Sequence, residues 1–226
     1  LLEPAAAPLE QRSEAFKSLV RECGTGAVVW RYDPIVLSNL TPPAFHRERF
    51  AAIADALHGF IDRVIVSLFA PYRSVLRSLR AIPELELWEH DEATARDTVE
   101  TLAAEADARG LEMQSCADPR IESIPGVRPG SCISEELLHA AGERGVQGTL
   151  SFSETGEQAR TIPGRRANTQ RRHCRCVESR DIGAYESCLF NCRYCYATHG
   201  PDKARTNYRR HDPDGPMLIP ANPEAA

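Results

Sequence analysis

Five of the eight cysteines of this chain lie in its last quarter, and their spacing is typical of a metal site. Cys188, Cys192 and Cys195 are separated by three and then two residues. This spacing lets three thiolates of one loop converge on three irons of a cubane [4Fe-4S] cluster. The fourth iron is left to another group, and Cys174 and Cys176 are additional candidate ligands.

Zinc and disulfides are the alternative uses of these thiols. A zinc ribbon pairs two Cys-x2-Cys knuckles, whereas only Cys192 and Cys195 form one here. A disulfide framework suits short secreted chains, and the start of this 226-residue chain lacks the basic and apolar run of a signal peptide. Spacing therefore favours iron. Tyr194, just before the last cysteine, could shield a cluster and offer a flat face to an adenine ring of a cofactor.

Polar residues at the ends of two predicted strands are candidates for catalysis. Side-chain alternation along residues 27–37 puts Arg31 and Asp33 on one face, near the end of the strand. Asp118 occupies the equivalent end of a later strand. Parallel α/β sheets place their sites at this end, so these three residues are predicted to line a pocket. The alternative for Arg31 and Asp33 is a structural ion pair.

The other cysteines and the histidines carry weaker signals. A lone cysteine is more often a small buried apolar residue than a ligand, so Cys23, Cys116 and Cys132 are interpreted as structural. His173 and His199 lie close enough in sequence to the cysteines to complete a metal site. The remaining histidines have no ligand spacing and are interpreted as ordinary residues: His46, His58, His90 and His139.

Strands and helices alternate along the first two thirds of the chain. Apolar periodicity and Pro or Gly boundaries predict strands over 27–37, 63–70 and 111–117, and helices over 45–61, 71–82, 91–108 and 134–141. This order predicts an α/β fold with a partial (β/α) barrel-like parallel sheet. Three such units cannot close a barrel, so we expect further units before Leu1.

The composition divides the chain into four parts. Residues 1–145 are predicted to form the partial barrel, 146–172 a linker or loop, 173–211 the cysteine-rich iron–sulfur segment and 212–226 a flexible tail. No apolar run is long enough for a membrane helix, and a cytoplasmic location is expected.

Charge is distributed unevenly between these parts. The net charge is −5, yet residues 165–210 hold 11 Lys and Arg against 4 Asp and Glu. This basic segment could attract nucleic acid, phosphate or a cofactor carboxylate, or it could offset the charge of the thiolates.

Several segments together resemble a bacterial family of unknown function, domain-of-unknown-function family 1848. They are WRYDPIVLS (30–38), QSCAD (114–118), GSCISEELL (130–138) and HCRCVESRDIGAYESCLFNCRYCYA (173–197). Members of that family carry a further N-terminal α/β portion. The cysteine spacing of the last segment is in turn similar to the loop of radical S-adenosylmethionine enzymes, and its YCYA ending is similar to spore photoproduct lyase. In those radical enzymes the loop lies near the N-terminus.

The resemblance implies a [4Fe-4S] cluster on Cys188, Cys192 and Cys195, whose open iron binds S-adenosylmethionine. Reductive cleavage of that cofactor would give a 5′-deoxyadenosyl radical, with Arg31 and Asp33 lining the pocket of an unidentified substrate. Such an enzyme would need an electron donor such as ferredoxin or flavodoxin. The alternative hypothesis is a non-enzymatic iron–sulfur or zinc module that senses redox state or binds nucleic acid.

Overall fold

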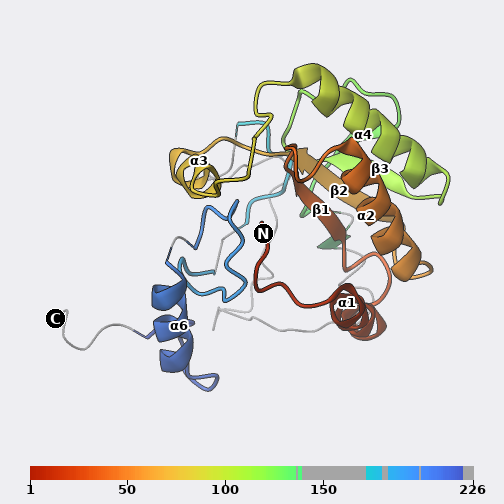
Figure 1. Ribbon diagram of the computed structural model, residues 1–226. Coiled ribbons are helices and arrows are strands. Elements are labelled where there is room, and N and C mark those ends of the chain that lie inside the picture. The colour runs from red at the N-terminus through yellow and green to blue at the C-terminus, as the bar shows by residue number, and fades with distance from the viewer. Residues whose placement is uncertain (136, 139–171, 180–182, 199, 221–226) are drawn as a thin grey trace.

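Four parallel strands form the sheet of the computed structural model, which describes residues 1–135, 137–138, 172–179, 183–198 and 200–220. The strands are β1 (Trp30–Ile35), β2 (Arg63–Leu68), β3 (Glu112–Ser115) and β4 (Val127–Pro129). They lie side by side in chain order, β1-β2-β3-β4 (Figure 1). Because barrels are built from parallel strands in sequential order, this open sheet matches the predicted partial (β/α) barrel-like α/β fold.

The helices lie before, between and after these strands. They are α1 (Leu9–Cys23), α2 (Pro43–Ala56), α3 (Arg73–Arg80), α4 (Glu92–Asp107) and α6 (Pro201–Arg210). The helices predicted over 45–61, 71–82 and 91–108 correspond to α2, α3 and α4. Helix α4 has the sharpest local signals, since the Asp91 carboxylate accepts the Thr94 N–H at 2.9 Å and Gly110 takes a φ of 68° just beyond the other end.

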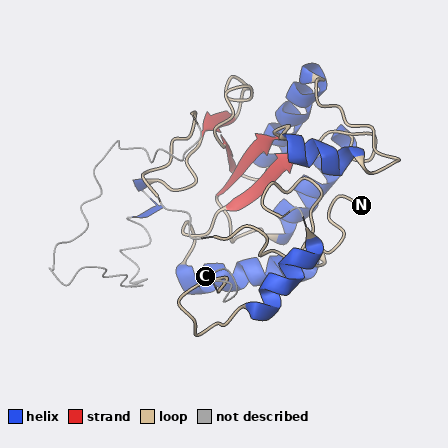
Figure 2. Ribbon diagram, turned by 90° about the vertical axis from the view of Figure 1, so that its left-hand side faces the viewer, coloured by secondary structure: helices blue, strands red, loops and turns tan. Residues whose placement is uncertain are grey.

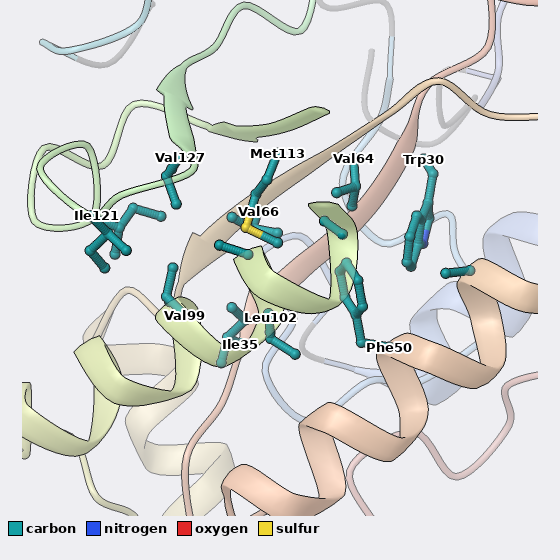
Figure 3. Packing of buried hydrophobic residues seen from close by; sticks show 14 of the residues in the cluster. Trp30, Ile35, Phe50, Val64, Val66, Val99, Leu102, Met113, Ile121 and Val127 are labelled. Carbon is teal, nitrogen blue, oxygen red and sulfur yellow. The ribbon is translucent and has the colours of Figure 1, made fainter. Parts of the chain in front are cut away.

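Apolar side chains from one face of the sheet pack against α2 and α4 to form the main core (Figure 3). Trp30, Val64 and Met113 project from three neighbouring strands, and Phe50 of α2 and Leu102 of α4 meet them. The ring centroids of Trp30 and Phe50 are 4.8 Å apart, and Phe50 is fully buried. In Figure 1, α2 and α4 lie next to one another along the sheet.

The opposite face of the sheet carries polar side chains toward the carboxyl ends of the strands. Register pairs Arg31 of β1 with Ile65 of β2, and Ile65 with Gln114 of β3. One step further along, Asp33 meets Ser67, whose hydroxyl donates to its carboxylate. The predicted alternation in the first strand is therefore confirmed, because Trp30 packs in the core while Arg31 and Asp33 pair on the other face.

The remaining predicted segments lie partly outside the described residues. The start of the short helix predicted over 134–141 is visible, since the Ser134 hydroxyl accepts the Leu137 N–H at 3.2 Å. Most of the predicted linker 146–172 lies outside the described residues, as does the end of the tail. In Figure 2 the helices lie mainly to the right of and below the strands. None of the helices of the described residues combines the length and apolar character that a bilayer crossing needs.

Candidate functional site

The cysteine loop is closed at its base by Glu186. The Glu186 N–H donates to the carbonyl of Ala197 at 2.8 Å, and its carboxylate accepts the Gly200 N–H at 3.1 Å, at the start of α6. Asn207 of α6 donates its amide to the Glu186 carbonyl at 2.9 Å. These bonds tie the ends of the loop to one helix, so the three cysteines between them are held in a closed turn.

Within this loop Cys188 and Cys195 lie close enough to Cys192 for their charges to act on its thiol. Burial raises the pKa of Cys192, and the charges of Glu3, Cys195 and Cys188 raise it further. The Ala197 N–H points at the Cys195 sulfur at 3.4 Å. No disulfide joins any two of the eight cysteines, all of which lie in the described part of the chain. Among the described residues, no group of three or more His, Cys, Asp or Glu side chains is placed to hold a metal ion.

Tyr194 attaches the loop to the α/β body. Its ring packs against an apolar cluster beside α3 that includes Val36 and Leu79. Its hydroxyl donates to the carboxylate of Glu3, and burial followed by this contact raises the pKa of Tyr194. A backbone hydrogen bond also attaches the loop to the start of the chain, since the Arg193 N–H donates to the Leu2 carbonyl at 2.8 Å.

A cavity of about 870 Å³ lies against β1 and is lined in part by Tyr194. The start of the chain, α1, α2 and side chains from both faces of β1 also line it, and Arg31 and Asp33 are among them. This volume falls in the range of small-molecule sites. The structure therefore connects the cysteine loop with two of the predicted catalytic residues through one tyrosine.

Arg31 and Asp33 form a close ion pair on the wall of this cavity, with 2.6 Å between Nη2 and Oδ2. Burial by itself would lower the pKa of Arg31, but the hydrogen bond and charge of Asp33 raise it, so the guanidinium stays charged. Its other terminal nitrogen donates to the sulfur of Cys132. The pair thus offers a fixed cation and a carboxylate to a ligand, and it also fits the structural ion pair considered above.

Asp118 has a different environment and is absent from the residues that line this cavity. Its side chain is buried, and both of its oxygens accept hydrogen bonds from the Arg120 guanidinium, at 2.8 and 2.7 Å. One oxygen also accepts the Leu68 N–H at 3.2 Å. Asp118 therefore joins the carboxyl ends of β2 and β3, and the structure does not bring it together with Arg31 and Asp33 as expected.

His46 was interpreted as an ordinary residue, and the structure places it on the cavity wall. The Tyr32 hydroxyl and His46 Nδ1 are 2.9 Å apart, and Nε2 lies 3.0 Å from the Val36 carbonyl. Burial lowers the pKa of His46, so the neutral ring is favoured. In the sequence, the signal for a buried His46 is its position four residues before Phe50, on the face of α2 that is buried.

A second group of thiols lies at the carboxyl ends of β3 and β4, where Cys116 and Cys132 were expected to be structural. The sulfurs of Cys116 and Cys132 are 3.4 Å apart. The segment that carries Cys174 and Cys176 lies beside them, since the Val177 N–H donates to the Ile133 carbonyl at 3.0 Å and the Ser131 hydroxyl is 3.2 Å from the Arg175 carbonyl. The two cysteines predicted as additional ligands of the cluster thus interact with Cys116 and Cys132.

Some of the predicted basic segment is neutralised within the chain. Arg175 pairs with Glu122 at 2.8 Å, and Arg205 pairs with Asp202 at 2.5 Å. The structure describes neither residues 165–171 nor His199. Nucleic-acid binding by this segment stays a prediction.

Comparison with known proteins gives a family and no more. Residues 1–197 match the model of a family described as "Domain of unknown function (DUF1848)". No curated protein and no solved structure matches the chain.

Proposed function

We propose that this chain, which belongs to the DUF1848 family, is an iron–sulfur protein of the radical S-adenosylmethionine kind. In this proposal Cys188, Cys192 and Cys195 hold a [4Fe-4S] cluster, and the cavity beside β1 receives the organic reactants. The observation that carries the proposal is the position of Tyr194. This residue lies between two of the cysteines in sequence and lines the cavity, so chemistry at the thiols would take place at the cavity wall.

The residues of the loop fit a cluster. The Ala197 N–H points at the sulfur of Cys195 in the triad, and Asn191 takes the left-handed conformation (φ 55°) that turns the chain between Cys188 and Cys192. Asn adopts this conformation more readily than most residues, and N–H groups directed at sulfur tune such clusters. When bound with one open iron, the cluster would supply the electron that cleaves S-adenosylmethionine.

The residues of the cavity would bind and orient the reactants. Arg31 presents a permanent cation that suits a carboxylate or phosphate, and Asp33 presents hydrogen-bond acceptors beside it. The Tyr194 ring would lie against an adenine, and the apolar part of the wall would exclude water. A reducing compartment such as the cytoplasm would keep the cysteines reduced. Ferredoxin or flavodoxin would be the electron donor of the cluster.

Anaerobic reconstitution with iron and sulfide tests this proposal. We expect about four irons per chain held by the triad, and an EPR signal of the dithionite-reduced protein that changes on adding S-adenosylmethionine. Cys192→Ser should lose this iron, whereas Cys23→Ser, at the end of α1 and away from the loop, should keep it. Full iron content in Cys192→Ser would refute the ligand assignment, and an EPR signal indifferent to the cofactor would favour the non-enzymatic alternative.

A further inference from the structure

We infer that Cys116, Cys132, Cys174 and Cys176 form a second thiolate site, distinct from the triad, that binds a single tetrahedral ion, Zn²⁺. Three separate parts of the chain supply these four residues: the end of β3, the turn after β4 and the segment 174–176. The inference does not depend on the proposed cluster, because none of the triad cysteines belongs to this set.

The first pair of thiols is positioned by the end of the sheet. Cys116 follows β3 directly, and its N–H continues the ladder to the Val66 carbonyl at 2.9 Å. Gly130 follows β4 and donates its N–H to the Ser115 carbonyl at 3.0 Å. A Cβ at position 130 would lie only 2.6 Å from that oxygen, so the close approach requires glycine. This contact sets the turn that brings the Cys132 sulfur to 3.4 Å from that of Cys116.

The second pair is brought to the same place by hydrogen bonds between two backbone segments. The Val177 N–H donates to the Ile133 carbonyl at 3.0 Å, and the Ser131 hydroxyl is 3.2 Å from the Arg175 carbonyl. The Arg175 guanidinium pairs with Glu122, which also accepts the Ser115 hydroxyl at 3.1 Å. Cys176 lies between these two hydrogen-bonded residues and contacts the backbone of Cys132, and Cys174 is two positions before it.

The electrostatic interactions among the four thiols agree with this arrangement. The pKa of Cys132 is raised by its hydrogen bond with Cys116 and by burial, and the charges of Cys116 and Cys176 raise it further. Burial would raise the pKa of Cys176 as well, but hydrogen bonds from the backbone at Ile133 and Cys132 and from the Cys174 thiol lower it. Cys176 therefore contacts both the turn that holds Cys132 and the neighbouring Cys174 thiol.

The short sulfur–sulfur distance favours one ion over a cubane cluster or a disulfide. Around a tetrahedral zinc the thiolates lie within about 4 Å of one another, whereas the thiolates of a [4Fe-4S] cluster bind different irons and are held further apart. At 3.4 Å the Cys116 and Cys132 sulfurs are in contact without being bonded. In the described part of the chain no three of these thiols are placed to hold a metal ion, so binding requires the thiols to move together.

The charges of the surroundings suit a tetrathiolate site. On binding Zn²⁺, the cysteines still protonated would release their protons to solvent, and four thiolates with one divalent ion carry a net charge of −2. The Arg31 guanidinium already donates to the Cys132 sulfur and would offset part of this charge. A hydrogen bond of this kind is typical of the second shell that orients metal ligands.

Metal analysis of the 226-residue chain tests the inference. We expect about one zinc per chain, and after exchange with Co²⁺ the absorption bands of a tetrahedral cobalt thiolate. Cys132→Ser and Cys176→Ser should each lose at least nine tenths of the zinc while keeping the iron of the reconstituted triad. Cys188→Ser and Cys23→Ser should keep the zinc. Two variants of the site are compared because Cys132→Ser alone could disturb the turn after β4.

The outcomes separate this inference from the proposed function. Loss of iron in Cys188→Ser with zinc retained supports two sites, and absence of iron in every protein would refute the proposed cluster while leaving the zinc result intact. Unchanged zinc in both Cys132→Ser and Cys176→Ser would overturn the inference. Loss of zinc in Cys188→Ser would also overturn it, and so would a second iron cluster that is lost in Cys132→Ser. A third contrary result would be a Cys116–Cys132 disulfide found by mass spectrometry in protein purified under reducing conditions.

Discussion

Replacement of Gly130 by alanine should destabilise the fold and weaken the second thiol site together. The added Cβ would lie 2.6 Å from the Ser115 carbonyl oxygen and 2.7 Å from the Gln114 Cβ, both part of β3. Because β3 is paired on both sides, the turn after β4 must move instead. We expect a loss of about 2 to 4 kcal/mol, from about 1 to 3 for the steric overlap and about 1 for the hydrogen bond from Gly130.

Urea unfolding followed by fluorescence of the buried Trp30 measures this loss, and zinc content measures the effect on the site. Gly200→Ala is the matched control, because its Cβ would have no neighbour closer than 3.6 Å and its backbone conformation is ordinary. We expect this control to change stability by less than about 1 kcal/mol. Wild-type stability and zinc content in Gly130→Ala would refute the argument that the turn depends on close backbone approach.

Three further predictions concern the carboxylate, the histidine and the tyrosine described above. Asp118→Asn should lower the free energy of unfolding by about 2 kcal/mol in urea titrations, because the Arg120 guanidinium loses its charged acceptor, with the metal content unchanged. Burial lowers the pKa of His46, so on acidification the unfolded chain binds a proton at this residue before the folded chain does. The free energy of unfolding should therefore fall as the pH drops below 6.5, the ordinary pKa of histidine, and it should fall less in His46→Gln. A Tyr194→Phe variant should bind S-adenosylmethionine as the wild type does, whereas Tyr194→Ala should bind about tenfold more weakly by calorimetry on the reconstituted protein. An equal effect of both tyrosine variants would contradict a role of the ring.

The strands and helices that the sequence predicts correctly have strong local signals. The run 63–70 is indicated by its apolar character, and the helix 91–108 is indicated by the capping residue Asp91. Helix α1, strand β4 and helix α6 were not predicted, and they lack such signals; α1 buries only Ser13 and Val20. Strand β4 has three residues, too few for a pattern to emerge, and α6 is polar almost throughout, so only Pro201 at its first turn marked it.

The two groups of cysteines also differ in how far the sequence predicts them. The triad lies within one loop, so its spacing alone makes it a candidate set of ligands. Cys116 and Cys132 are 16 positions apart, and they meet only because β3 and β4 are adjacent and parallel. Cys174 comes from beyond a segment of 33 undescribed residues, 139–171. Register and loop docking decide such contacts, and neither can be derived from the types of the cysteines themselves.

Arg31 connects the two proposed sites, and this connection gives the second site a role beyond stability. The guanidinium contacts Asp33 on the cavity wall and Cys132 beside the second group of thiols. Hydrogen bonds and the Arg175–Glu122 ion pair hold the segment 172–177, and a metal ion would cross-link it to the sheet. Loss of that ion would let the Cys132 sulfur take up a proton, which weakens it as an acceptor for the Arg31 guanidinium. A change in ligand affinity at the cavity after zinc removal would follow from this contact, because one of the two groups that orient the cation would lose its charge.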